Sequence, residues 1–221
     1  METRIIDGAA LASATRMELK PRVSRLSAIG RTPGLAVILV GEDPASQVYV
    51  RNKSRACEEI GIRSIQHKLP TSTSQQDLLA MVSSLNQDPD IHGILVQLPL
   101  PKHIAADAII EAIAPHKDVD GFHPQNVGLL ATGNPRFIPC TPAGVMRLLS
   151  HAGVELAERH AVVVGRSNIV GKPVALLLLE KHATVTICHS RTVDLGRVLR
   201  EADVIIAAVG KARMITADMV K

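Results

Sequence analysis

The chain has 221 residues, of which 46% are hydrophobic and 21% are charged, and its formal net charge is +4. This balance is that of an ordinary globular protein and argues against a disordered or fibrous chain. The longest apolar runs are too short to cross a bilayer, and the N-terminus lacks the layout of a secretion signal. We therefore expect a cytoplasmic protein with no membrane partner.

The cysteines, histidines and basic residues indicate neither a metal site nor a nucleic-acid partner. Cys57, Cys140 and Cys188 are widely spaced and odd in number, which suits reduced thiols better than disulfides or a zinc site. The nine histidines show no metal-ligand spacing. Lysines and arginines are dispersed and aromatic residues make up only 1% of the chain, so a small anionic ligand explains the positive charge as well as a nucleic acid does.

Short runs rich in β-branched residues alternate with helix-like stretches along the chain. Strands are expected within residues 34–41, 63–69, 92–98, 160–166, 183–190 and 202–210. Helices are expected near residues 8–29, 44–60, 75–86, 104–114, 142–152, 171–181 and 194–201. This alternation predicts an α/β fold in which parallel sheets carry helices on both faces.

The stretch from residue 121 to residue 142 interrupts this alternation with glycine, proline and asparagine. Such composition is typical of a segment between domains. We therefore expect two domains, residues 1–141 and 142–221, with the helix near 142–152 as the connector.

The helix over residues 44–60 is predicted from its ends, because Asp43 can cap it and Gly61 suits the position after it. Its helical periodicity predicts an inward stripe that contains Ala45, Tyr49, Lys53, Ala56 and Ile60. A lysine on that stripe can exchange protons with a bound ligand. The alternative is that Lys53 extends its ammonium group to water from the edge of the stripe, which is the usual arrangement.

Polar side chains also follow the third predicted strand. Gln97 precedes prolines that stop the strand, so it lies at the carboxyl end, where open α/β sheets bind ligands. Asp118 and Asp120 follow shortly before the interdomain segment. The alternative for each of these residues is a purely structural role, in which its side chain bonds the backbone of a turn. A carboxylate at this place could instead accept paired hydrogen bonds from a planar amino-heterocycle.

The second domain contains a hydrophobic strand followed by a glycine turn and a helix. Gly165 allows a phosphate to approach the backbone, and the N-terminus of the helix offers free N–H groups. Ser167 stands where the second glycine of a dinucleotide fingerprint is expected, and the next glycine is Gly171. The turn alone is therefore a weak indication of dinucleotide binding.

The following strand strengthens this interpretation and favours NADP over NAD. Ser190 and Arg191 stand at the end of this strand, and no acidic residue is there for a ribose 2′-hydroxyl. Arg166 and Arg191 could hold a 2′-phosphate together, although each could also be an ordinary solvated arginine. The second domain is thus predicted to be a Rossmann-like NADP-binding domain.

Five segments in this order resemble the bifunctional methylenetetrahydrofolate dehydrogenase/cyclohydrolase family, and the resemblance covers nearly the whole chain. They are "YVRNK", "VQLPLP", "KDVDGFHPQNVG", "PCTPAGV" and "VVVGRSNIVGKPVALLL". The resemblance implies NADP-dependent oxidation of 5,10-methylenetetrahydrofolate to the methenyl form, and hydrolysis of the latter to 10-formyltetrahydrofolate. It also implies a site in a cleft between the domains and a homodimer formed through the second domain.

The resemblance also assigns roles to individual residues. Lys53 matches the key catalytic lysine, with Tyr49 and Gln97 beside it, and Asp120 matches the residue that holds the pterin. On the cofactor side, Arg166 and Ser190 match positions near the 2′-phosphate, and Thr141 and Gly165 match cofactor-contacting positions.

The chain ends at "ITADMVK", whereas the family continues with further strands, a loop that lines both ligands and a terminal helix. The resemblance thus implies an incomplete second domain, in a fragment or a natural short form. Two alternatives follow: a truncated module that binds NADP without turnover, and a basic nucleic-acid-binding protein, whose affinity would fall steeply with salt.

Overall fold

The computed structural model describes residues 3–221, which divide into two compact units. The first unit ends at Pro124 and the second begins at Gln125. This division falls within the predicted interdomain stretch, and the boundary expected after residue 141 lies inside the second unit. Within the described residues, no helix combines the length and apolarity needed to cross a bilayer.

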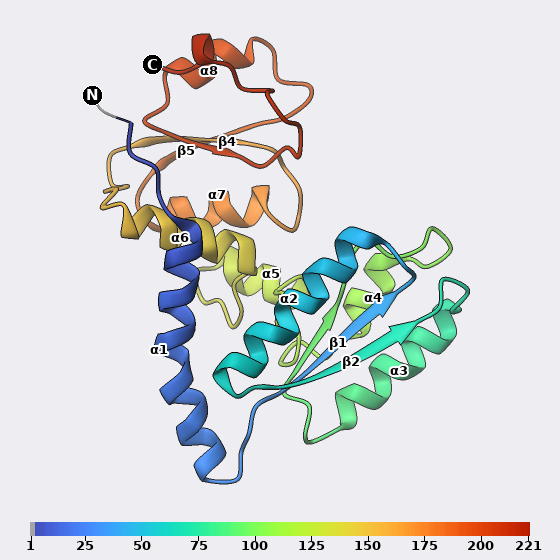
Figure 1. Ribbon diagram of the computed structural model, residues 1–221. Coiled ribbons are helices and arrows are strands. Elements are labelled where there is room, and N and C mark those ends of the chain that lie inside the picture. Colours follow the sequence, from blue (N-terminus) through green and yellow to red (C-terminus); the bar gives the residue numbers. More distant parts are fainter. Residues whose placement is uncertain (1–2) are drawn as a thin grey trace. The chain divides into compact units, whose positions relative to one another are not determined.

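The first unit is built on a parallel sheet of three strands with the order β2-β1-β3 (Figure 1). Its elements are α1 Gly8–Ala28, β1 Gly34–Val40, α2 Pro44–Ile60, β2 Arg63–Leu69, α3 Gln75–Gln87, β3 Gly93–Val96 and α4 Ala106–Ala112. Each strand and helix coincides with one predicted from the sequence, and the α/β fold with parallel sheets is confirmed.

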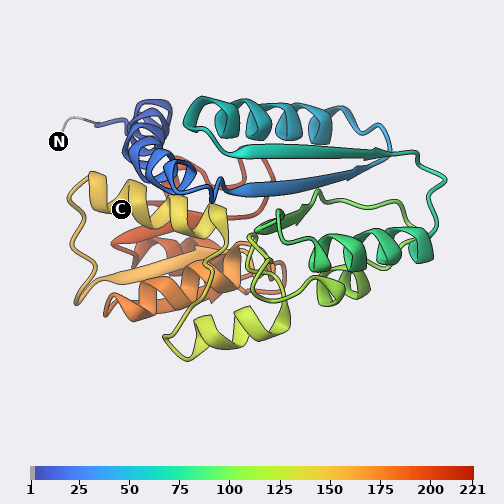
Figure 2. The ribbon, with the colours of Figure 1, turned by 90° about the horizontal axis from the view of Figure 1, so that it is seen from below.

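Helices cover both faces of this sheet, with α2 on one face and α3 and α4 on the other (Figure 2). Alternate residues of β1 serve the two faces, because side chains alternate along a strand. Ala36 and Ile38 belong to the larger apolar cluster with α3 and α4, whereas Val37 and Leu39 pack with Val50 of α2. The strand is therefore buried on both sides, as its continuous apolar sequence predicts.

The ends of α2 are as predicted, but its buried stripe is not. The Asp43 side chain accepts a hydrogen bond from the backbone N–H of Ser46 at 2.7 Å, and Gly61 takes the left-handed conformation with φ of 88°. The buried residues of α2 are Ser46, Val50, Ser54, Cys57 and Ile60. The predicted stripe is thus wrong at its N-terminal end, where Ala45 and Tyr49 are exposed.

Small polar residues explain this difference. Ser54 is buried because its hydroxyl accepts a hydrogen bond from Gln66 Nε2 at 2.6 Å and lies 3.2 Å from the hydroxyl of Ser64, both on β2. A satisfied serine fits closely against a strand, whereas the larger Tyr49 does not. The helix is thus rotated relative to the prediction, and Lys53 lies half-buried at the edge of its buried face.

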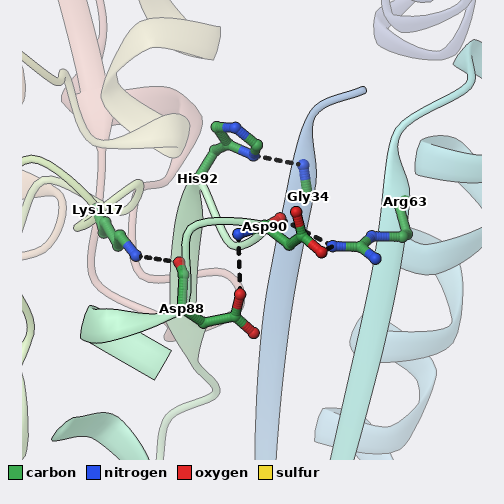
Figure 3. A network of polar contacts seen from close by, with 6 residues as sticks. All are labelled: Gly34, Arg63, Asp88, Asp90, His92 and Lys117. Atoms are coloured by element: carbon green, nitrogen blue, oxygen red, sulfur yellow. Dashed lines mark hydrogen bonds and ion pairs between the residues drawn. The ribbon is translucent and has the colours of Figure 1, made fainter. Parts of the chain in front are cut away.

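A buried lysine fixes the segment that precedes Asp118 (Figure 3). Lys117 is 7% exposed, and its ammonium group donates hydrogen bonds to the carbonyls of Leu85 at 3.0 Å and Asp88 at 2.7 Å. These carbonyls lie at the C-terminal end of α3, where a positive charge is favourable. The backbone carbonyl of Lys117 also accepts a hydrogen bond from the N–H of Ile94 in β3 at 2.7 Å.

The connection from α3 to β3 is held at the same end of the sheet. Arg63 donates a hydrogen bond to the Asp90 carbonyl at 3.0 Å and lies 3.5 Å from its carboxylate. The backbone N–H of Gly34 donates to His92 Nδ1 at 3.1 Å, which joins this connection to the start of β1 (Figure 3). The amino-terminal ends of the strands are thus held by polar contacts, and their carboxyl ends remain for ligands.

The second unit repeats this arrangement with the strand order β5-β4-β6, again parallel. Its elements are α5 Pro124–Ala131, whose first residue closes the first unit, α6 Cys140–His151, β4 His160–Val164, α7 Gly171–Glu180, β5 Thr184–Cys188, α8 Leu195–Arg200, β6 Val204–Ala207 and the short 3₁₀ helix Ala217–Met219. Figure 1 shows α7 and α8 on opposite sides of β4 and β5.

Helix α5 was not predicted, because the stretch 121–142 was expected to be irregular. Pro124 suits the first position of a helix, since its φ is already helical and its missing N–H is not needed there. Asn126 and Leu130, four residues apart, are buried on one face. One turn signal thus marks the start of a helix, and tertiary burial outweighs the low helix propensity of Asn126 and Gly128.

Candidate active site

The candidate site of the first unit lies where the strand order reverses. The chain passes from the central β1 to β2 on one side and then returns to β3 on the other. Ligands of open parallel sheets bind at the carboxyl ends of strands on either side of such a reversal. Gln97 follows β3 directly, and its backbone N–H donates to the carbonyl of Ile38 in β1 at 2.9 Å.

Lys53 and Gln97 meet at this edge although they are 44 residues apart in sequence. The Lys53 ammonium donates a hydrogen bond to Gln97 Oε1 at 3.3 Å. Gln97 Nε2 in turn donates to the carbonyl of Leu98 at 2.8 Å, which fixes the orientation of the amide. The lysine therefore does not simply extend to water: its amine is held by an oriented acceptor at the carboxyl end of β3.

Asp120 completes this group from the segment after Lys117. The pKa of Asp120 is raised to about 6, mainly by burial; the positive charge of Lys53 opposes this rise, and the negative charge of Asp118 contributes to it. The charge of Lys53 thus acts on the carboxyl of Asp120. A carboxyl that titrates near neutral pH beside an amine is typical of functional sites.

Tyr49 lies one turn before Lys53 on α2 and is 63% exposed. Residues four apart on a helix are neighbours on its surface, so Tyr49 borders the group formed by Lys53 and Gln97. The Tyr49 ring is thus an exposed aromatic surface beside Lys53 and Gln97. The inward position that the sequence predicts for Tyr49 is not observed.

Asp118 supports Asp120 in a way that the sequence left open. It is 1% exposed, and its carboxylate accepts a hydrogen bond from the backbone N–H of His123 at 2.8 Å. This bond closes the turn that contains Asp120 and Gly121. Asp118 is therefore a structural carboxylate whose charge also acts on Asp120. In the sequence, the only indication of this charge effect is that the two aspartates are two residues apart.

In the second unit, the glycine turn follows the central strand β4 at the equivalent reversal. Gly165 has a φ of +127°, and a side chain there would clash with the carbonyl of Ala208 after β6. A side chain on Gly171 would clash with the carbonyl of Gly165. The turn and the start of α7 thus approach so closely that a side chain at either glycine would separate them, and a tight glycine turn before a helix fits a bound dinucleotide.

Ser167 shapes the turn from within. Its hydroxyl accepts hydrogen bonds from the backbone N–H groups of Val170 and Gly171, both at 3.2 Å. The second of these N–H groups belongs to the first residue of α7, so the serine holds the turn against the start of the helix. Any phosphate at this turn would share these donors with the Ser167 hydroxyl.

Arg166, Ser190 and Arg191 are exposed and follow two neighbouring strands. The register pairs Val164 with Cys188, so the turns after β4 and β5 begin side by side. A 2′-phosphate between these turns would find two guanidinium groups, the arrangement that arginine favours for phosphate. Thr141, also exposed, lies in the first turn of α6, which packs against α7.

Two models of one protein family match the chain, one in each unit. Residues 6–120 match the tetrahydrofolate dehydrogenase/cyclohydrolase catalytic domain, and residues 139–221 match the NAD(P)-binding domain of the same family. The chain belongs to the tetrahydrofolate dehydrogenase/cyclohydrolase family. The fold expected from the resemblance, with its C-terminal NAD(P)-binding domain, is thereby confirmed.

Members of this family are similar to the chain over its whole length. The bifunctional protein FolD of Moorella thermoacetica is 62% identical over 221 residues, which cover 100% of this chain and 79% of that protein. The bifunctional protein FolD of Bordetella avium is 60% identical over 221 residues and is covered to 78%. The length that the chain shares with these proteins includes both of its units.

Solved structures of the family show the same fold. The bifunctional enzyme FolD-methylenetetrahydrofolate dehydrogenase/cyclohydrolase from Campylobacter jejuni matches with a TM-score of 0.96 at 50% identity, over 99% of this chain and 78% of that one. The methylenetetrahydrofolate dehydrogenase-cyclohydrolase of Trypanosoma brucei, complexed with NADP cofactor and an inhibitor, matches with a TM-score of 0.96 at 40% identity, over 100% of this chain and 76% of that one.

Proposed function

We propose that this chain catalyses the NADP-dependent oxidation of 5,10-methylenetetrahydrofolate to 5,10-methenyltetrahydrofolate and the hydrolysis of the latter to 10-formyltetrahydrofolate. Family membership supports both reactions. The observation that carries the assignment to residues is the hydrogen bond between Lys53 Nζ and Gln97 Oε1 at 3.3 Å beside Asp120. Family membership and this group together do not favour a nucleotide-binding module without turnover.

In the hydrolysis, Lys53 moves protons. Water that attacks the methenyl carbon must lose a proton, and a ring nitrogen must gain one as the ring opens. An amine held at a fixed position can serve both transfers, which is general acid–base catalysis. Gln97 orients that amine through its oxygen atom, because its NH₂ group is engaged with the Leu98 carbonyl at 2.8 Å.

Asp120 binds the amino-heterocycle of the substrate. A carboxylate can accept two parallel hydrogen bonds from neighbouring N–H groups of a planar ring. Since burial raises the pKa of Asp120 to about 6, this carboxyl is ionised and able to accept both bonds above that pH. Tyr49 offers an aromatic face at the border of the same group.

In the oxidation, the nitrogen lone pairs beside the methylene carbon assist departure of the hydride, so the protein mainly positions the substrate. When bound, NADP accepts that hydride. We assign its binding to the turn formed by Gly165, Arg166 and Ser167, together with Ser190 and Arg191. Thr141 completes this cofactor set. The two arginines favour NADP because they can hold its 2′-phosphate.

We further propose a cytoplasmic homodimer formed through the second unit, which follows the resemblance to the family. Analytical ultracentrifugation of the chain tests the dimer directly. A mass of two chains at micromolar concentration is the expected result, and a monomer at that concentration would contradict it.

Turnover by Lys53→Met tests the catalytic assignment. We expect the cyclohydrolase rate to fall by roughly 10²- to 10⁴-fold, the usual contribution of a general acid–base group. Lys20→Met on α1 is the matched control, because Lys20 is an exposed lysine of the same unit. Hydrolysis by Lys53→Met close to the wild-type rate would refute the role of this residue.

NADPH formation and NADP binding are measured in parallel on the wild-type chain. Formation of NADPH with 5,10-methylenetetrahydrofolate is the expected outcome. Binding of NADP without any turnover of folate by a folded chain would instead support the nucleotide-binding module.

A further inference from the structure

The first unit contains a cavity of about 490 Å³ that the proposed reactions do not use. It opens at the carboxyl ends of β1 and β2, under the first turns of α2. Its lining residues come from these three elements and the turns that follow the strands: Leu39, Gly41, Glu42, Gln47, Val50, Arg51, Gln66, Lys68, Leu69 and Pro70. The cavity therefore lies entirely within one unit.

The cavity and the Lys53 group lie on opposite flanks of α2. Successive residues of a helix are rotated by about 100°, so the directions of Arg51 and Lys53 differ by about 160° around the helix axis. Lys53 faces Gln97 at the end of β3, whereas Arg51 lines the cavity beside β2. Figure 2 shows α2 lying along one face of the sheet. A ligand in the cavity would thus not occupy the position of the folate ring.

Positive charge dominates the cavity. Arg51 and Lys68 are both exposed, and within residues 3–221 neither side chain forms an ion pair or a hydrogen bond. Glu42 is the single acidic residue of the lining, so two cations face one carboxylate. Two cations without partners at a concave surface attract an anion, and arginine binds carboxylate or phosphate in paired hydrogen bonds.

The floor of the cavity is apolar and is fixed in place. Leu39 and Val50 belong to the apolar cluster between the sheet and α2, and Leu69 packs against the cluster on the other face. Gln66 is held by the hydrogen bond from its Nε2 to Ser54 at 2.6 Å, which leaves its oxygen atom as an acceptor. An anion with a carbon skeleton fits this floor better than a bare inorganic ion does.

We propose that this cavity is a second ligand site, which binds a small organic anion. Its carboxylate or phosphate group lies between Arg51 and Lys68, and its carbon skeleton lies over Leu39 and Val50. The site is independent of the proposed folate chemistry, because it shares none of the residues assigned to that chemistry.

Titration calorimetry with three probes tests the proposal. Glutarate supplies a carboxylate on a carbon chain, phenyl phosphate supplies a phosphate on an apolar body, and inorganic phosphate is a bare oxyanion. We expect glutarate or phenyl phosphate to bind more tightly than inorganic phosphate. The tighter of the two organic probes identifies the anionic group. Backbone amide resonances of Gly41, Glu42 and Gln66 should shift in NMR spectra on binding.

Two double variants, each lacking two positive charges, decide whether Arg51 and Lys68 hold the probe. Arg51→Gln combined with Lys68→Gln should weaken binding roughly tenfold or more, because charge-assisted hydrogen bonds are lost. Arg22→Gln combined with Lys102→Gln removes two exposed charges of the same unit elsewhere and should change affinity by less than about twofold. The proposal is refuted if no probe saturates the protein, if both double variants lose affinity equally, or if inorganic phosphate binds as tightly as the organic probes.

Discussion

Replacement of Asp120 by asparagine should make the first unit more stable at neutral pH while impairing its function. Ionisation of the Asp120 carboxyl in its buried position is costly, since burial raises its pKa from 3.8 to about 6. Asparagine has a shape similar to that of aspartate but carries no charge, because its side-chain amide does not ionise. The variant therefore removes the cost of ionising a carboxyl in this position.

The size of the effect follows from the two pKa values. One pKa unit corresponds to about 1.4 kcal/mol, so the rise from 3.8 to about 6 corresponds to about 3 kcal/mol of lost stability when Asp120 is fully ionised. The folded chain holds the proton more tightly than the unfolded chain does. The contribution is thus favourable below pH 3.8, is lost as the pH rises through about 6, and does not change further above that.

Urea denaturation of the wild type and Asp120→Asn at pH 4.5 and pH 7.5 measures this difference. The free energy of unfolding of Asp120→Asn relative to the wild type should increase by about 2 kcal/mol between these pH values, because part of the cost is already present at the lower pH. Asp107→Asn on α4 is the matched control, since Asp107 is an exposed aspartate of the same unit. This control should retain the pH dependence of the wild type.

The reasoning is refuted if the difference between the wild type and Asp120→Asn is the same at both pH values. A carbon-13 NMR titration of the Asp120 carboxyl gives an independent answer, and a midpoint near 4 would also contradict it. If both measurements agree with a midpoint near 6, loss of folate binding by Asp120→Asn can be attributed to the missing carboxylate, because the variant is no less stable.

Three further predictions concern other contacts. Lys53→Met should raise the pKa of Asp120 above about 6, because the ammonium charge that lowers it is removed; the same NMR titration measures this. Lys117→Met should lower the free energy of unfolding by about 3 kcal/mol in urea denaturation, since a buried and a partly buried carbonyl lose a charged donor. Gly171→Ala should weaken NADP binding roughly tenfold or more, because its side chain would displace the turn at Gly165. Gly128→Ala, with open space around the new side chain, should leave calorimetric NADP affinity unchanged.

The strands and most helices could be predicted from the sequence, because each is bounded by local signals. The helix that begins at Pro44 has a capping aspartate before it and a glycine after it, and both act as predicted. Helix α5 lacked such agreement: its asparagine and glycine residues indicate a loop, and its helical state depends on burial of Asn126 and Leu130. Local propensity therefore describes elements well only where tertiary contacts do not oppose it.

The orientation of α2 could not be predicted from hydrophobicity alone. The true buried stripe contains two serines, whose burial depends on hydrogen bonds with β2. A single sequence does not reveal which serines will find such partners. Lys53 is nevertheless inside the candidate site, because it lies on the edge shared by the predicted and the observed stripes.

The sequence alone could not predict which residues of the candidate site lie close to one another. The glutamine and the aspartates were recognised as possible site residues, but each could equally have served a turn. The structure places the oxygen atom of Gln97 3.3 Å from Lys53, a contact that supports the proposed role of Gln97. It also gives Asp118 a structural bond with His123, which distinguishes it from Asp120. These distinctions depend on atoms that are distant in the sequence.

The two units share a topological rule that explains where their candidate sites lie. In each, the first strand is central and the next two strands pair with it on opposite sides. Gln97 follows the third strand of the first unit, and Gly165 follows the first strand of the second unit at its close approach to Ala208. Both sites thus occur where the chain reverses direction across the sheet, because there the connecting helices leave the strand ends uncovered. The Arg51 and Lys68 cavity lies away from that reversal, so its assignment depends on charge and shape: the double variant tests the charge, and the comparison of organic probes with inorganic phosphate tests the shape.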